Sequence, residues 1–293
     1  MKVNKLIGAL LLAGAASIWG GMFVVVKAAV KLIPPVELVW LRYLVAAVTL
    51  ALFLAIRRPK WHWDRKNGLL IVLCGLVGNA LSICFQETGT WLSSAQLGAV
   101  VTTTTPAFMV LFAWWLRKVR PKRGDWASLA LAMAGVLVIV GWQFSGHRLL
   151  AGAACLLVAA LTWALMSVLL QLIDPAYDAL QVTFLAVVVA LVTLTPWVLT
   201  HWGQTLGKVD LTAAPVLLQI GYLGAVSTAL AFVMWNAGLR RFDSNLAGLF
   251  FLFQPVVGAV LGWLVLGEAL THGFFIGMLL LAASFWVALR EGS

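Results

Sequence analysis

The sequence predicts an all-α integral membrane protein in which ten transmembrane helices form two inverted five-helix repeats. Of its 293 residues, 63% are hydrophobic and 10% are charged, and the mean hydropathy is +1.02. A soluble domain of this length cannot bury so much apolar surface. Two apolar runs are each interrupted by a polar side chain followed by a proline, at Pro106 and at Pro255, 149 residues apart. The composition therefore predicts an integral membrane protein, and the recurring interruption predicts an internal repeat.

Ten apolar runs are long enough to cross a bilayer. A hydrocarbon core of ~30 Å needs about 20 apolar residues per helix, and charged loops separate runs of this length. The first run follows Lys2 and Lys5 like a secretory signal, but it continues through Val26 and predicts an uncleaved spanning helix. The predicted spans are Leu6–Val30, Pro35–Ile56, Gly68–Gln86, Ser94–Leu116, Trp126–Trp142, Leu149–Ile173, Tyr177–Leu199, Pro215–Ala237, Ser244–Leu266 and Thr271–Leu289.

Basic residues predict the orientation of these spans. Fifteen of the 20 Lys and Arg residues fall on the side of the membrane that holds the N-terminus. The positive-inside rule therefore predicts that both termini are cytoplasmic. The net charge of +10 is then explained by basic loops that set the orientation of the spans, and no nucleic-acid partner is expected. Neither the three cysteines nor the four histidines show metal-ligand spacing, so no cofactor, metal or disulfide framework is expected.

The second half of the chain is a degenerate copy of the first. Gly75 pairs with Gly224, and Trp114 with Trp263, at the same offset of 149 residues as the two prolines. Because five spans per repeat is an odd number, the second copy must enter the membrane from the opposite side. We expect repeats at residues 1–145 and 146–293 within one membrane domain. Inverted repeats with polar breaks in register are typical of secondary transporters, whereas a structural bundle gives no reason to keep such breaks.

Polar side chains share one face of the third predicted span. Asn79, Ser82 and Gln86 recur at helical spacing, and the corresponding positions of the second repeat include Thr228 and Trp235. Polar groups that face lipid are costly, so these faces are expected to line a cavity inside the bundle. Hydrogen bonding between helices is the alternative.

The two proline breaks have two interpretations. Pro106 cannot donate to the carbonyl of Thr102, and neighbouring Thr hydroxyls can cap such a carbonyl. Thr102 and Thr105 share one face of the fourth span, and Gln254 occupies the matching face before Pro255. The prolines are therefore candidate hinges during gating, and the hydroxyls and amide are a candidate binding surface.

Two tryptophans and two cations complete the candidate site. Trp19 and Trp163 lie within spans and, by pseudo-symmetry, are predicted as opposite walls of one cavity, with lipid-facing positions as the alternative. Lys27 lies near the outer end of its span, where a lysine can snorkel. Arg42 lies too deep to snorkel and needs a carbonyl or carboxylate partner. It is interpreted either as a structural clamp or as an attractor of an anionic substrate group.

Carboxylates and enzymatic motifs give weaker signals. Glu37, Glu87 and Glu268 lie at the outer ends of spans, where solvated caps or surface pairs are expected. No catalytic constellation or phosphate-binding loop is present in the sequence, so enzymatic activity is not expected.

Three short motifs occur in order along the predicted double repeat. They are Trp19-Gly20-Gly21 followed by Lys27, Pro34-Pro35 leading into Leu41-Arg42, and Leu266-Gly267-Glu268 after Pro255. With these motifs, nearly the whole chain resembles the EamA family of the drug/metabolite transporter superfamily. The resemblance implies small-metabolite transport, commonly export of amino acids or related compounds, through a central cavity. The first span lacks the mid-span glutamate that four-helix multidrug relatives use for proton exchange.

The predicted function is secondary transport of small organic metabolites across a bacterial cytoplasmic membrane by alternating access, and the family resemblance implies export of amino acids or related compounds. One alternative is a permease for larger polar or phosphorylated metabolites, and another is a membrane scaffold that transports nothing. The expected partners are a small-molecule substrate and the lipid bilayer, and the sequence is compatible with a monomer. The direction of transport and the driving ion are left open.

Overall fold

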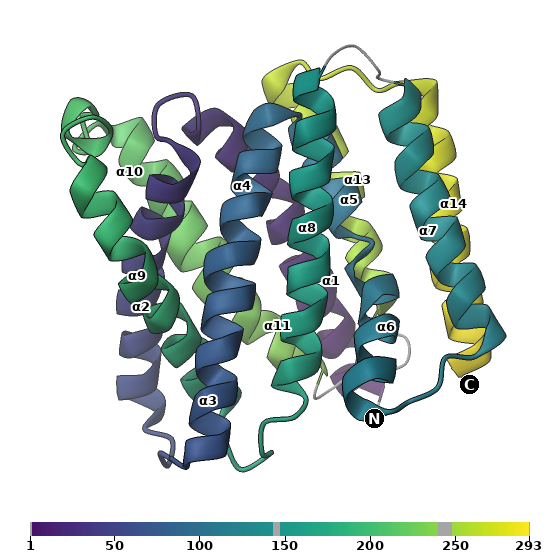
Figure 1. Ribbon diagram of the computed structural model, residues 1–293, viewed down its shortest axis with the longest axis horizontal. Coiled ribbons are helices and arrows are strands. Elements are labelled where there is room, and N and C mark those ends of the chain that lie inside the picture. The colour runs from purple at the N-terminus through teal and green to yellow at the C-terminus, as the bar shows by residue number, and fades with distance from the viewer. Residues whose placement is uncertain (1, 143–146, 240–247, 293) are drawn as a thin grey trace.

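A computed structural model describes residues 2–142, 147–239 and 248–292, and the regular structure in these ranges is helical. The helices form one bundle, and both ends of the chain lie at the same end of it (Figure 1). The elements of the first half are α1 (Lys2–Ala29), α2 (Pro35–Arg57), α3 (Arg65–Cys74), η1 (Gly75–Ser82), α4 (Ile83–Leu92), α5 (Ala95–Thr102), α6 (Thr105–Arg117) and α7 (Arg123–Trp142). Those of the second half are α8 (His147–Leu170), α9 (Ala179–His201), η2 (Leu206–Lys208), α10 (Ala214–Gly221), η3 (Tyr222–Leu230), α11 (Ala231–Leu239), η4 (Gly248–Leu252), α13 (Phe253–Leu266) and α14 (His272–Gly292).

Every predicted span coincides with a helical stretch. Seven stretches within the described ranges are long and apolar enough to cross a membrane, by length and composition. The other predicted spans fall on α7, on η4 with α13, and on α14. The start of the ninth predicted span, at Ser244, lies outside the described residues. Ten membrane crossings and a cytoplasmic location of the termini remain predictions.

Local sequence sets where several helices begin and end. The Ser94 hydroxyl accepts a hydrogen bond from the backbone N–H of Leu97 at 3.0 Å and so caps the start of α5. Helices α6 and α13 end at residues in the left-handed conformation, Lys118 with φ of 59° and Gly267 with φ of 69°. These two positions are related by the same offset as Pro106 and Pro255, so the corresponding helices of the two halves end in the same way.

The third and eighth predicted spans each contain a π-helical stretch. The first is η1, and the offset between the two prolines places its counterpart at 224–231, which overlaps η3. A π-helix makes i→i+5 hydrogen bonds, is rare, and often occurs at functional sites. Asn79 lies in η1 and Thr228 in η3, so both stretches carry residues that the sequence assigned to the candidate site.

Close contacts between helices also repeat. A Cβ atom on Gly75 would meet the backbone oxygen of Ala186 at 2.8 Å, and one on Gly224 would meet the backbone oxygen of Arg42 at 2.6 Å. The two glycines occupy corresponding positions of the two halves, and the backbones that they meet belong to α9 and α2, which coincide with the second predicted span of each repeat. Both positions therefore require glycine because a neighbouring helix backbone occupies the space of a side chain.

Helices α7 and α14 form a pair at one edge of the bundle (Figure 1). Their hydroxyls at Ser128 and Ser284 are 2.9 Å apart. A Cβ atom on Gly135 would meet the backbone oxygen of Gly277 at 2.9 Å, so small residues allow the two helices to approach closely. Most of the remaining helices surround a central cavity.

Candidate functional site

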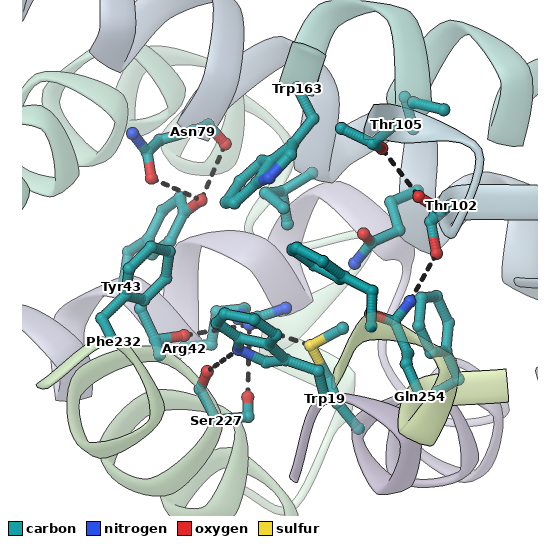
Figure 2. Close-up of a pocket in the computed structure, with 18 residues that line it drawn as sticks. Trp19, Arg42, Tyr43, Asn79, Thr102, Thr105, Trp163, Ser227, Phe232 and Gln254 are labelled. Carbon is teal, nitrogen blue, oxygen red and sulfur yellow. Dashed lines mark hydrogen bonds between the residues drawn. The ribbon is translucent and has the colours of Figure 1, made fainter. Parts of the chain in front are cut away.

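The central cavity contains about 650 Å³ of empty space, its opening included. Nine of the side chains that the sequence assigned to the candidate site line it, and Figure 2 shows most of them converging. From the first half of the chain these are Trp19, Arg42, Asn79, Gln86, Thr102 and Thr105. From the second half they are Trp163, Thr228 and Gln254.

Ser82 shares the predicted face of Asn79 but does not line the cavity, because its hydroxyl donates to the carbonyl of Ala159 at 2.7 Å. Four residues of the candidate site do not line it either. The Trp235 ring lies 5.3 Å from Trp19 and 4.7 Å from Phe251 between centroids, so it supports the aromatic wall. Pro106 and Pro255 lie in the first turns of α6 and α13, where a missing N–H breaks no hydrogen bond within the helix. Their role as hinges remains a prediction. The fourth is Lys27, which lies at a helix junction.

An aromatic wall joins the two halves of the chain. The Phe232 ring lies between Trp19 and Trp163, with centroid distances of 5.7 and 6.0 Å (Figure 2). Phe251 stacks on Trp19 at 6.0 Å, and the Trp19 indole N–H donates to the carbonyl of Ser227 at 3.0 Å. Sequence reasoning missed both phenylalanines. Phe232 follows Thr228 by four residues and so shares its helical face, which was a usable signal.

Arg42 is held by a buried network. Its Nη1 donates to Glu87 Oε1 at 2.8 Å. Its Nη2 donates to the hydroxyls of Thr228 at 2.9 Å and Ser227 at 3.3 Å (Figure 2). The exposed fractions of Arg42 and Glu87 are 3% and 0%. The expectation that this deep arginine needs a carbonyl or carboxylate partner is confirmed.

The structure corrects the prediction for two carboxylates. Glu87 is the buried counter-ion of Arg42 and not a solvated cap, so the helix continues past the predicted boundary at Gln86 to Leu92. Glu37 is also buried, with an exposed fraction of 2%. It lies in the first turn of α2, where the helix dipole favours a negative charge.

The two helix breaks meet at one side of the cavity. Gln254 Nε2 donates to the hydroxyl oxygen of Thr102 at 2.7 Å and to the carbonyl of Ala99 at 3.3 Å. The Thr105 hydroxyl donates to the carbonyl of Thr102 at 2.7 Å. Pro106 has no N–H to donate to this carbonyl, and the Thr105 hydroxyl takes the place of that donor. The predicted local capping by a threonine is therefore confirmed.

Lys27 and Glu268 organise the junction between α4 and α5. Lys27 Nζ donates to the carbonyl of Thr90 at 3.0 Å, near the end of α4. The Glu268 carboxylate accepts from the backbone N–H groups of Ala95 at 2.7 Å and Gln96 at 3.0 Å, at the start of α5. A cation at a helix C-terminus and an anion at a helix N-terminus both favour the helix dipole. These charged residues of the sequence motifs therefore hold the fold outside the cavity.

Apolar membrane-length helices packed around a cavity with aromatic and polar walls define a transporter-like membrane protein. The sequence model of the EamA-like transporter family matches residues 6–141 and, a second time, residues 150–290. The chain belongs to the EamA-like transporter family. It is a transporter and not an enzyme, and it is a multi-pass protein of the bacterial cytoplasmic membrane.

Named relatives span most of the chain. A Salmonella typhimurium protein named "Probable amino-acid metabolite efflux pump" is 28% identical over 285 residues, which is 92% of this chain and 90% of the relative. The Escherichia coli K12 protein named "Uncharacterized inner membrane transporter YedA" is 28% identical over 261 residues, or 87% of this chain and 81% of the relative. A solved crystal structure has the same fold, with a TM-score of 0.68 and 20% identity, and the match covers 98% of both chains.

Proposed function

We propose that this transporter exports amino acids or related small organic metabolites by alternating access between two inverted five-helix repeats, residues 1–145 and 146–293. In this proposal ten helices cross the membrane and both termini are cytoplasmic. The observation that carries the proposal is the central cavity, in which an aromatic wall faces hydrogen-bonding side chains. A solute with an apolar part and a polar end matches this lining.

The lining of the cavity supports a small amphipathic solute. Binding sites for small molecules combine an apolar lining with a few polar groups. Here Trp19, Trp163 and Phe232 offer apolar surface, while Asn79 and Gln86 offer amide groups. Thr102, Thr105, Thr228 and Gln254 add further hydrogen-bonding groups.

The charge of the cavity argues against a phosphorylated substrate. Among the described residues that line it, Arg42 is the charged one, and its charge is balanced by Glu87. A phosphate ester brings two negative charges that this pair does not neutralise. Export of amino acids is supported by the name of the Salmonella relative, which is that of a probable efflux pump for amino-acid metabolites.

The repeated contacts support the inverted arrangement. Close helix–helix contacts occur at Gly75 and at Gly224, which are corresponding positions of the two halves. The π-helical stretches η1 and η3 also overlap at corresponding positions. Two halves with equivalent contacts can exchange conformations, which opens a central site first to one side and then to the other.

Counterflow into liposomes tests this function. Purified protein is reconstituted in liposomes loaded with one of the twenty protein amino acids, an organic cation or a sugar phosphate, and uptake of the labelled solute is measured against empty liposomes. We expect counterflow of one or more amino acids with an apolar side chain. Counterflow of the sugar phosphate alone would favour the permease for larger metabolites, and the absence of any amino-acid counterflow would reject the assignment.

A pair of tryptophan variants links the transport to the cavity. Trp163→Leu removes part of the aromatic wall and is expected to slow counterflow about tenfold, which corresponds to ~1.4 kcal/mol. Trp263→Leu is the control because this ring is 54% exposed on the outside of the bundle. Equal rates in the two variants would show that the solute does not contact this wall.

A further inference from the structure

Two hydrogen-bond donors on residues that line the cavity have no acceptor in the described part of the chain. They are the Nε–H of Arg42 and the side-chain amide Nε2 of Gln86. The exposed fractions of these residues are 3% and 8%, so bulk water does not satisfy either donor. A buried donor without an acceptor costs about 1–3 kcal/mol, and more when it carries a charge. Native proteins contain few such groups. Three other buried side-chain atoms in the described ranges also lack a partner, all of them acceptors, and one is Glu87 Oε2 on the counter-ion of Arg42. The two donors are the unpaired atoms that belong to residues lining the cavity, so an acceptor that enters the cavity is placed to satisfy them.

The protein fixes the Arg42 guanidinium so that the free donor stays in place. Nη1 is bonded to Glu87 and Nη2 to Thr228, both within 2.9 Å. These contacts come from two different helices, α4 and η3, and hold the plane of the guanidinium. Gln86 precedes Glu87 on α4, so one turn of this helix supplies both a partner of Arg42 and the second free donor.

The chemistry of the two donors selects an acceptor with two oxygens. A carboxylate has two acceptor oxygens and no donor, and the planar guanidinium of arginine matches its geometry. An ammonium group offers no acceptor, and an alcohol offers a single oxygen whose own O–H needs a further acceptor. A neutral amide would offer one oxygen and would bring an NH₂ group toward the remaining donor.

The charge balance of the site favours a solute that carries a positive group as well as its carboxylate. Arg42 and Glu87 together are neutral, and both are buried. A simple organic anion would place an uncompensated negative charge in a low-dielectric site, which is costly. A zwitterion adds no net charge. This favours an amino acid over a plain carboxylic acid.

We propose that Arg42 and Gln86 form the subsite for the α-carboxylate of a zwitterionic amino acid whose apolar side chain lies against Trp19 and Trp163. This proposal rests on the transport function proposed above. Glu87 acts as a positioning residue, because it orients the guanidinium and does not contact the solute. The subsite gives the cavity a polar end that recognises the part common to all amino acids.

Matched solutes test the subsite. Thermal unfolding of the purified protein is followed with each of the twenty amino acids and with the corresponding α-carboxamides, because a solute that binds the folded state raises the unfolding temperature with its concentration. We expect at least one amino acid to raise it and the matching amide to need about tenfold more solute for the same shift. An amide as effective as its acid would overturn the subsite and would indicate that water satisfies the two donors.

The remaining outcomes separate this proposal from the proposed function. One outcome is that organic cations or sugars stabilise the protein and show counterflow, while no amino acid stabilises it or shows counterflow. The carboxylate subsite is then wrong, but the protein is still a transporter of small solutes. If no solute stabilises the protein and none shows counterflow, the proposed function fails and the subsite fails with it.

A glutamine pair tests the role of Gln86 directly. Gln86→Leu removes a side-chain donor that has no acceptor in the described structure. The unfolding temperature without solute should therefore stay the same or rise. The amino-acid concentration needed for a given rise in unfolding temperature should increase about tenfold. The control is Gln181→Leu on α9, because Gln181 is fully buried outside the cavity and its Nε2 donates to the carbonyl of His62 at 3.1 Å. The control should unfold at a lower temperature and bind as the wild type does. Unchanged binding by a folded Gln86→Leu protein would overturn the proposal.

Discussion

The side-chain amide of Gln254 donates a hydrogen bond to the hydroxyl oxygen of Thr102 at 2.7 Å, so the helix breaks of the two halves contact each other directly. Each break lies before a proline, at Pro106 and Pro255, in corresponding helices of the two halves. A hydrogen bond between two breaks couples any bending of one helix to the other. The contact also lies at the cavity, because both residues line it.

The energetic coupling of this pair is measurable. Gln254→Leu and Thr102→Val should each lower the free energy of unfolding by about 1 kcal/mol, because each removes a buried hydrogen bond. The double variant should lose about 0.6 to 1 kcal/mol less than the sum, since both single changes remove the same bond. A double-mutant cycle of reversible unfolding in detergent checks this. Strictly additive effects would show that the two side chains do not interact in the folded protein.

Removing the counter-ion of Arg42 should be strongly destabilising. Glu87→Leu leaves a buried guanidinium without its carboxylate, and breaking a buried ion pair in this way costs about 3–5 kcal/mol. Combining Glu87→Leu with Arg42→Met should restore most of the lost stability, because an apolar pair of similar size replaces the ion pair. Unfolding temperatures of the three variants test this expectation. Near-wild-type stability of Glu87→Leu alone would contradict it.

A glycine pair tests the close packing of α1 on α13. A Cβ atom at Gly20 would lie 2.5 Å from the backbone oxygen of Gln254 and 2.9 Å from Val257 Cβ, so Gly20→Ala should lower stability by about 1–3 kcal/mol. Gly221 lies in a helix with no atom within 4 Å of the added methyl, and Gly221→Ala should stabilise by up to about 1 kcal/mol. Opposite shifts in unfolding temperature are expected. Shifts of the same sign would show that packing does not require glycine at position 20.

Asp64 should give stability a specific pH dependence. Its carboxylate accepts hydrogen bonds from the side chain of Asn67 at 2.6 Å, from the Asn67 backbone N–H at 2.9 Å and from the Tyr177 hydroxyl at 2.8 Å. These bonds lower the pKa of Asp64 from 3.8 to about 2. Because the folded-state pKa is depressed, the stabilisation is fully present above the ordinary carboxyl pKa near 4 and is lost as the pH falls toward 2.

The variant Asp64→Asn should therefore unfold at a lower temperature than the wild type at pH 7. The difference should shrink as the pH is lowered from 4 to 2, because the wild-type carboxylate becomes protonated there. Thermal unfolding in a detergent that tolerates acid measures both proteins over this range. A difference that stays constant with pH would mean that the Asp64 charge contributes nothing.

The helical stretches were predictable because the bilayer imposes a length and apolar composition on each span. The boundary at Gln86 was placed too early, since a carboxylate at the end of an apolar run ordinarily marks the membrane surface. Glu87 is an exception because Arg42, 45 residues earlier, neutralises it inside the bundle. That partnership depends on how α2 and α4 pack, and no local pattern contains this information.

The candidate site was predictable in part for a similar reason. Helical spacing identified Asn79 and Gln86, and the repeat extended the prediction to Thr228, so periodicity and symmetry located polar cavity residues. Phe232 and Phe251 were not assigned to the site because an aromatic side chain in a membrane helix ordinarily contacts lipid. Its orientation depends on tertiary packing. The sequence therefore predicted the polar end of the cavity better than its apolar wall.

The π-helical stretch at Gly75–Ser82 gives a single-residue deletion in this helix a specific meaning. A π-helical turn holds one residue more than an α-helical turn, so losing one residue there would restore the ordinary α-helical repeat and leave the later side chains facing the same neighbours. A deletion in the α-helical parts on either side would instead turn all later side chains by about 100° about the helix axis. In an alignment of relatives, a one-residue gap within this stretch is thus compatible with an intact pair of Arg42 and Glu87, whereas a gap between the stretch and Gln86 is not.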